Sequence, residues 1–174
     1  MSTEPTTEPR TGFDPAVLIE THQAGVWRYL RVLGCEPALA DDLTQETFLQ
    51  LLQGSFQEYS TAATAAFLRR TAHNLFVTAM RRQKRVTTLE NLENLDTEWT
   101  MWAGSDNGEA LLEALRGCLQ QLGDRAKWAL EMRFRERLPR SEIAGALKMT
   151  EHGAKNLMQR AKEKLRACIG SKLA

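Results

Sequence analysis

The sequence predicts an all-α protein, with two small helical domains joined by an acidic flexible linker. Apolar residues recur at spacings of three and four residues through most of the chain, as they do on amphipathic helices. No stretch alternates apolar and polar residues with an excess of β-branched side chains, so strands are not expected. The length of 174 residues allows two small domains, and 43% hydrophobic with 26% charged residues is typical of a folded, soluble chain.

The distribution of charge sets the expected domain boundaries. Residues 1–13 are rich in Thr, Pro and Glu and are expected to form a disordered tail. A first helical domain is expected over residues 14–85, where basic residues slightly outnumber acidic ones. Residues 86–109 contain six acidic residues and no Lys or Arg, which predicts the linker. Residues 110–174 contain fourteen basic and seven acidic residues and form the second domain.

Capping residues and glycines predict three helices in the first domain. Asp14 followed by Pro15 is typical of an N-cap with proline at the first helical position, and Gly34 ends this helix. A second helix is expected from Pro37 to Gly54. A third is expected from about Ala62 to Arg85, with an apolar stripe formed by Phe67, Leu68, Thr71, Leu75 and Ala79.

The second domain contains a predicted helix-turn-helix. A leucine-rich helix comes first, and Gly123-Asp124 separates it from the next helix. The segment from Ser141 to Ile169 then indicates a short helix, a tight turn and a long helix. The expected buried stripe of the long helix is Ala154, Met158, Ala161 and Leu165.

The residue types exclude several functions. The longest apolar runs are about four residues, far below the roughly 20 that span a bilayer, and the polar N-terminus is no secretory signal. We expect a cytoplasmic protein. Cys35, Cys118 and Cys168 are odd in number and widely spaced, so neither a disulfide framework nor a zinc site is expected. No nucleophile motif, phosphate loop or metal-ligand spacing is present, so we expect neither an enzyme nor a cofactor.

The face of the last helix opposite its buried stripe predicts DNA binding. Amide and cationic side chains of the kind found there can bond purine edges in a major groove, and side chains at the start of the short helix can meet phosphates. The alternative is an ordinary solvated helix face, but the basic excess and the turn spacing favour DNA. The predicted DNA-binding residues are Arg140, Ser141, His152, Lys155, Asn156, Gln159 and Arg160.

Two helices of the first domain have polar surfaces of opposite charge. The third helix has a basic strip that either binds DNA or only complements the helix dipole; its residues are Arg70, His73, Asn74, Arg81, Arg82 and Arg85. The second helix has an acidic patch beside an aromatic residue, formed by Asp41, Asp42, Gln45, Glu46 and Phe48. This patch either suits the helix dipole or forms a docking surface for a basic or amphipathic partner helix.

Three segments, in this order, resemble bacterial sigma factors of the extracytoplasmic-function (ECF) type. They are ALADDLTQETFLQLL, FLRRTAHNLFVTAMRRQKR and, after the acidic segment, LGDRAKWALEMRFRERLPRSEIAGALKMTEHGAKNLMQRAKEKL. The resemblance extends from Pro15 to Ile169. The most specific part is DDLTQETF, because family members carry a closely similar stretch in the helix that docks on the polymerase clamp.

The resemblance implies a transcription initiation factor with no catalysis of its own. The acidic patch would bind core RNA polymerase. The third helix, with Tyr59 as a stacking group in the preceding segment, would hold the −10 promoter element and assist melting. The second domain would read the −35 element. Family members are commonly held by an anti-sigma factor, so such a partner is expected as well.

The sequence departs from the family pattern at several positions, and two other functions stay open. Lys148 stands where a turn glycine is usual and would need a left-handed backbone, and Gly153 replaces a better helix former. His73 stands where an arginine is frequent. The alternatives are a stand-alone helix-turn-helix regulator and a degenerate sigma-like protein that binds polymerase without supporting initiation.

Overall fold

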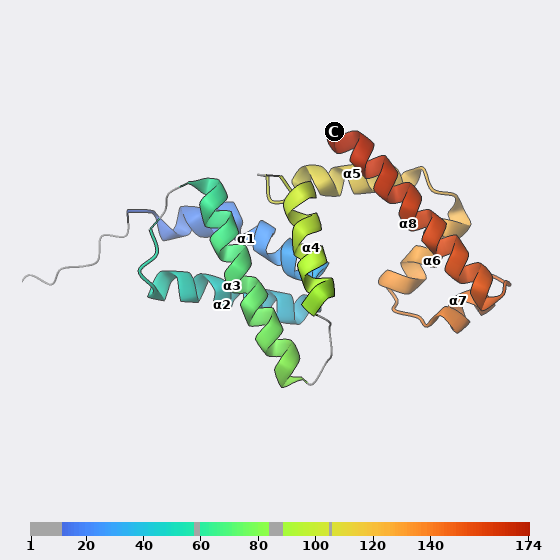
Figure 1. The fold of residues 1–174 in the computed structure, drawn as a ribbon, viewed down its shortest axis with the longest axis horizontal. Helices are drawn as coiled ribbons and strands as arrows, with labels where there is room; N and C mark the ends of the chain where they lie inside the picture. Colours follow the sequence, from blue (N-terminus) through green and yellow to red (C-terminus); the bar gives the residue numbers. More distant parts are fainter. Residues whose placement is uncertain (1–11, 58–59, 84–88, 105) are drawn as a thin grey trace, which may run out of the picture. The chain divides into compact units, whose positions relative to one another are not determined.

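The regular secondary structure of the described residues is helical, as predicted (Figure 1). The computed structural model describes residues 12–57, 60–83, 89–104 and 106–174. Eight helices lie in these ranges: α1 (Pro15–Val32), α2 (Pro37–Gln53), α3 (Thr61–Arg82), α4 (Leu89–Trp102), α5 (Glu109–Gln120), α6 (Asp124–Phe134), α7 (Arg140–Ala146) and α8 (Glu151–Leu173).

The chain folds as two compact units, Met1–Gly108 and Glu109–Ala174. In the first unit α1, α2 and α3 contact one another, and α4 contacts α1. In the second unit α8 contacts α5, α6 and α7. Because α4 is a helix of the first unit, the prediction of a flexible linker through this part of the chain was wrong.

The order of α4 comes from contacts with distant residues. Leu92 and Trp99 are buried, and the Trp99 ring lies 6.0 Å from that of Tyr29 on α1. Asp96 accepts a hydrogen bond from the Tyr29 hydroxyl and pairs with Arg69 of α3. The acidic composition suggested a solvated segment, but these apolar and paired residues supply the burial that an isolated helix of this length lacks.

Side-chain caps fix several of the helix starts. The Asp14 carboxylate accepts from the Ala16 N–H at 2.9 Å, so α1 begins where the sequence predicted. The Ser60 hydroxyl caps α3 in the same manner, accepting from the Ala63 N–H. Phe13 is buried and its ring lies 5.6 Å from that of Phe56, so the predicted disordered tail is wrong at this residue. Residues 1–11 lie outside the described part.

The buried stripe of α3 differs from the predicted one. Of the predicted stripe only Leu68 is buried; Phe67 is exposed, and Thr71, Leu75 and Ala79 are half-buried. The buried residues repeat at intervals of four and are Thr64, Leu68, Ala72, Phe76 and Met80. Both rows contain small or apolar side chains, so spacing alone did not distinguish them, and packing against α1 and α2 selects the second row.

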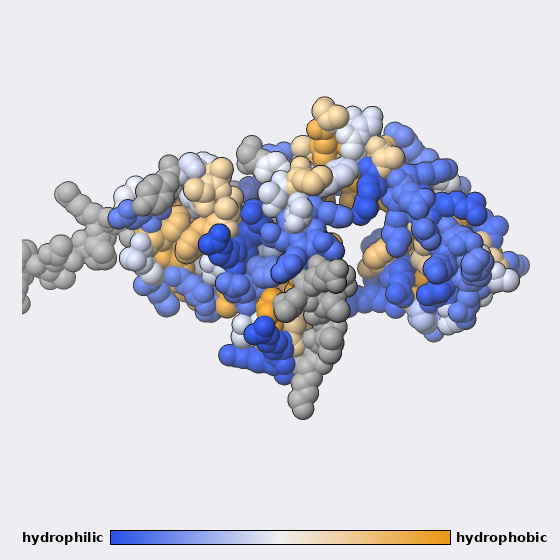
Figure 2. All heavy atoms as spheres, in the orientation of Figure 1, coloured by the Kyte–Doolittle hydropathy of each residue, from blue (hydrophilic) through white to orange (hydrophobic). Residues whose placement is uncertain are grey.

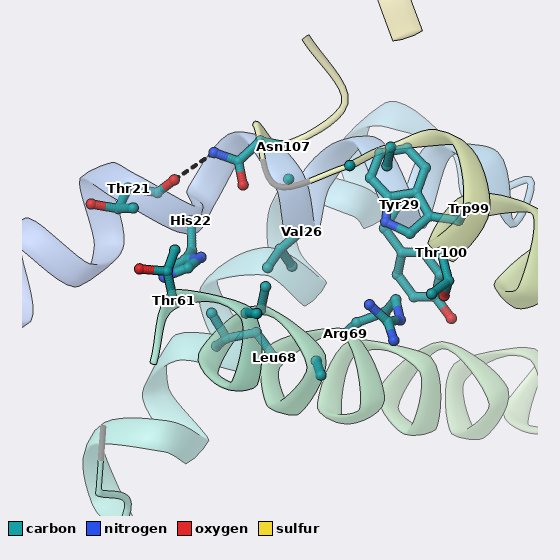
Figure 3. Close-up of a pocket in the computed structure, with 16 residues that line it drawn as sticks. Thr21, His22, Val26, Tyr29, Thr61, Leu68, Arg69, Trp99, Thr100 and Asn107 are labelled. Atoms are coloured by element: carbon teal, nitrogen blue, oxygen red, sulfur yellow. Dashed lines mark hydrogen bonds between the residues drawn. The ribbon is translucent and has the colours of Figure 1, made fainter. Parts of the chain in front are cut away.

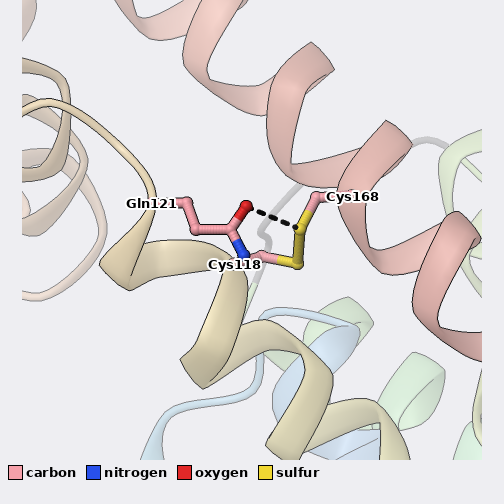
Figure 4. The surroundings of a disulfide bond; sticks show 3 residues. All are labelled: Cys118, Gln121 and Cys168. Atoms are coloured by element: carbon pink, nitrogen blue, oxygen red, sulfur yellow. Dashed lines mark hydrogen bonds between the residues drawn. A yellow bond between two sulfur atoms is a disulfide. The ribbon is translucent and has the colours of Figure 1, made fainter.

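A disulfide joins Cys118 of α5 to Cys168 of α8, so the expectation from the sequence that the cysteines form no disulfide framework was wrong for this pair (Figure 4). Their Cα atoms lie 5.9 Å apart, although the residues are 50 positions apart in the sequence. The packing of α8 along α5 brings the two side chains together. Cys35 is a buried free thiol, and burial raises its pKa to about 11, which keeps it in the unreactive protonated form.

The surface of the second unit is mostly hydrophilic on the face seen in Figure 2. Its apolar core lies between α6, α7 and α8 and contains Leu130, Ile143 and Met158. Among the described helices of the whole chain, none is long and apolar enough to cross a membrane.

Candidate functional site

The helix-turn-helix of the second unit is formed by α7, a turn over residues 147–150, and α8. Ala154, Met158 and Ala161 of α8 are buried, as predicted, while Leu165 is half-buried. The opposite face of α8 is therefore turned to solvent. The predicted DNA-binding residues His152, Lys155, Gln159 and Arg160 are exposed on α8, Asn156 is half-buried, and Arg140 and Ser141 are exposed at the start of α7.

The turn between α7 and α8 is defined by Lys148 and Thr150. Lys148 has a φ angle of +51°, the left-handed conformation that the sequence predicted for this position. The Met149 N–H bonds the Ala144 carbonyl at 3.0 Å, which closes the end of α7. The Thr150 hydroxyl accepts from the Gly153 N–H, so Gly153 lies in the capped first turn of α8.

Lys148→Gly is expected to stabilise the second unit. A side chain in the left-handed region costs about 1–2 kcal/mol, while glycine increases the entropy of the unfolded chain by about 0.4–1 kcal/mol. The net expectation is a free energy of unfolding higher by roughly 0.5–1 kcal/mol, measured by urea unfolding. Lys148→Ala is the control, since it removes the charge but keeps the strained backbone. An equal gain from alanine would contradict the explanation.

The basic strip of α3 is largely exposed. Arg70, Asn74, Arg81 and Arg82 are turned to solvent. Because positions 70, 74 and 81 are four and seven residues apart, they lie on one face of the helix. His73 differs, since it is half-buried and its Nδ1 atom lies 2.9 Å from the Tyr29 hydroxyl. Tyr59 and Arg85 lie outside the described residues.

The acidic patch of α2 lies beyond the first turn of the helix. Asp41 and Asp42 are the fifth and sixth residues of α2, and the helix has no acidic residue in its first turn. The helix dipole therefore does not explain these acidic residues, because its stabilising effect on negative charge is confined to the first turn of the helix. Both side chains are exposed, as are those of Gln45 and Glu46. Phe48 is only 5% exposed, so it lies beneath the acidic patch rather than among the exposed side chains.

A groove of about 480 Å³ lies beside this patch, between α1 and α2. Trp27 forms part of its wall and donates a hydrogen bond to Asp41 Oδ1 at 2.7 Å. The buried Thr44 hydroxyl has no hydrogen-bond partner among the described residues. The groove is lined by Ile19, Gln23, Trp27, Asp41, Thr44, Gln45, Phe48, Leu49 and Leu52.

Sequence reasoning missed the apolar part of this groove. Leu49 and Leu52 are 49% and 37% exposed, and they follow Gln45 at intervals of four and seven residues. That spacing places all three on one face and could have indicated a mixed polar and apolar surface. Such a surface suits an amphipathic helix that presents basic and aliphatic side chains together. Among the described residues, no cluster of His, Cys, Asp and Glu could hold a metal ion.

Comparison with known proteins identifies both units. The first matches the family model of Sigma-70 region 2 over residues 18–86, and the second matches Sigma-70, region 4, over residues 112–165. The ECF RNA polymerase sigma factor SigM of Bacillus subtilis (strain 168) is 23% identical over 154 residues, covering 86% of this chain and 91% of SigM.

A solved structure, that of the RsbN–BldN complex, contains a chain that is 22% identical. The match covers 88% of this chain and 90% of that one, with a TM-score of 0.32.

The ordered pair of region 2 and region 4 defines a transcription initiation factor. The chain belongs to the sigma-70 family and is a sigma factor of the ECF type. A stand-alone regulator would leave the region 2 match unexplained. The comparisons therefore favour the sigma factor over both alternatives.

Proposed function

We propose that the α1/α2 groove and its acidic rim bind core RNA polymerase. Asp42 and Glu46 are exposed beside the apolar groove, so a partner helix with basic and aliphatic side chains would find complementary groups on one surface. Asp41 is positioned by Trp27 and Gln45 lies next to it. Phe48 contributes from below, as a buried support for the groove rather than an exposed contact.

Promoter DNA is the proposed ligand of α3 and α8. On α3 the exposed Arg70, Asn74, Arg81 and Arg82 would contact the −10 element, with Tyr59 and Arg85 as further candidates from the sequence. On α8 the face from His152 to Arg160 would read the −35 element. The observation that carries this proposal is the exposed amide and cationic face of α8 opposite its buried Ala154–Ala161 stripe.

The proposed activity is binding and promoter melting, with no reaction catalysed by the chain itself. Because core RNA polymerase and the promoter are its proposed partners, the protein would work in the cytoplasm. A protein that covers the groove of α2 and the basic faces of α3 and α8 would prevent all three contacts at once. We therefore propose that an anti-sigma factor holds it inactive.

Arg81→Gln combined with Arg82→Gln tests the −10 surface. In vitro transcription with purified core polymerase on a genomic library first identifies promoters that depend on this protein. The double variant is then expected to lower open-complex formation at those promoters by about 5- to 30-fold, if each phosphate contact contributes about 0.5–1 kcal/mol. Core binding, measured by co-migration with polymerase, should be unchanged.

Arg116→Gln with Arg135→Gln is the matched control, because it removes two exposed arginines outside the proposed surfaces. Normal open complexes with the Arg81/Arg82 variant would exclude α3 as the −10 surface. A complete absence of transcripts with the wild-type protein, despite core binding, would contradict the proposed promoter function as a whole.

A further inference from the structure

Three residues from three helices form a hydrogen-bonded chain beside the proposed −10 surface. Tyr29 of α1, His73 of α3 and Asp96 of α4 come together although they are far apart in the sequence. The Tyr29 hydroxyl lies 2.8 Å from Asp96 Oδ1 and 2.9 Å from His73 Nδ1. The neighbouring pocket is lined by Tyr29, Arg69 and Trp99, whose side chains converge in Figure 3.

Asp96 sets the direction of the first hydrogen bond. Its Oδ1 atom accepts from Arg69 Nε at 3.2 Å and from the Tyr29 hydroxyl. An ionised carboxylate can only accept hydrogen bonds, so the Tyr29 hydroxyl must be the donor in its hydrogen bond to Asp96. Burial, and then the hydrogen bond to Asp96, raise the pKa of Tyr29 well above its usual range, so the hydroxyl keeps that proton.

The direction of the second hydrogen bond follows from the first. A phenol has one proton, and the Tyr29 hydroxyl already uses it in the hydrogen bond to Asp96. Towards His73 the Tyr29 oxygen can therefore only accept, and Nδ1 of His73 must be the donor. In the neutral imidazole a proton on Nδ1 leaves Nε2 with a free lone pair.

We propose that Asp96 is a positioning residue for promoter recognition, which acts through Tyr29 to hold His73 in the tautomer that presents Nε2 as an acceptor. The proposal rests on the −10 role proposed for α3. His73 is half-buried and follows the exposed Arg70 by three residues, a spacing that places it beside Arg70 at the edge of the basic strip. An acceptor suits the amino group of a base and does not suit a phosphate, so this residue would contribute to sequence preference.

Two variants of Asp96 separate the hydrogen bond from the charge. Asp96→Ala removes the acceptor, so Tyr29 can donate to His73 Nδ1 and the ring proton should move to Nε2. Asp96→Asn keeps an oxygen that can accept from both Tyr29 and Arg69, so it should retain the wild-type tautomer without the negative charge. Glu93→Gln is the control for charge on α4, since Glu93 is exposed on the same helix.

Nitrogen-15 NMR of the histidine rings, at a pH where the rings are neutral, measures the tautomer directly. We expect wild type, Asp96→Asn and Glu93→Gln to carry the His73 proton on Nδ1, and Asp96→Ala to carry it on Nε2. Exposed His152 serves as an internal reference. A proton on Nε2 in the wild type, or an unchanged ring in Asp96→Ala, would overturn the proposed relay.

Transcription from a panel of single-base changes in the −10 element tests the consequence. Asp96→Ala should alter preference at one position by roughly three- to tenfold, the value of one hydrogen bond, while Asp96→Asn should not. A tautomer change without altered preference would overturn the role in recognition. If the Arg81/Arg82 double variant also has no effect on any promoter, the result contradicts the proposed −10 role of α3 itself.

Discussion

Removal of the Cys118–Cys168 disulfide is expected to lower the free energy of unfolding of the second unit by about 2–4 kcal/mol. The residues are separated by 50 positions, and chain-entropy arguments assign roughly 4 kcal/mol to a loop of this length. The unit contains only the 66 residues from Glu109 to Ala174, so its total stability is small. The loss should therefore be a large fraction of the whole.

Cys168→Ala is the preferred variant for this test. Cys168 is half-buried at the surface of α8, whereas Cys118 is nearly inaccessible, so the substitution leaves the packing around Cys118 in place. Hydrogen exchange should become faster in α5 and α8 of the variant, and of the wild type after reduction. The first unit is the internal control. Its Cys35 is a free thiol, so hydrogen exchange in α1–α3 should not change when reductant is added. Alkylation of the denatured, unreduced protein that finds three free thiols, instead of Cys35 alone, would contradict the structure of this site.

The elements predicted best from the sequence are those defined by local interactions. The start of α1 depends on Asp14 and Pro15, and the start of α8 depends on Thr150. In both cases the residues that make the cap are close neighbours in the sequence. The left-handed backbone at Lys148 was expected from the resemblance, because family members usually have a glycine at this turn position, and the structure has it. Most of the polar faces of α2, α3 and α8 follow directly from helical periodicity.

The features that were missed depend on residues far apart in the chain. The helix α4 is ordered by Tyr29 and Arg69, which lie 67 and 27 residues from Asp96. Composition describes only the acidic residues of this segment, although Leu92 and Trp99 also stand at helical spacing. The disulfide likewise needs the packing of α5 along α8. The sequence did not predict the burial of Phe48, because helical periodicity alone does not show which side of α2 will pack against the other helices.

Reversal of charge on α2 is expected to abolish binding to core RNA polymerase. In the proposed complex, Asp42→Lys with Glu46→Lys would place two positive charges against a basic partner helix. Like charges in contact across an interface cost several kcal/mol, so we expect a loss of affinity of at least about 100-fold. Both side chains are exposed, so the fold should tolerate the change. Asp41 is left intact because it bonds Trp27 within the unit. Glu113→Lys with Glu136→Lys, two exposed residues of the second unit, controls for the change in net charge.

The groove predicts a second and kinetically different effect on the same binding. Charged groups at a rim mainly set the rate of association, whereas buried apolar contacts mainly set the rate of dissociation. Charge reversal should therefore slow association in a manner that depends on salt. Leu49→Ala, which shortens a half-exposed side chain of the groove, should speed dissociation with little salt dependence. Surface plasmon resonance with immobilised core polymerase measures both rates. If the acidic rim matters but Leu49 does not, the groove is no part of the interface and α2 binds polymerase through its charges alone.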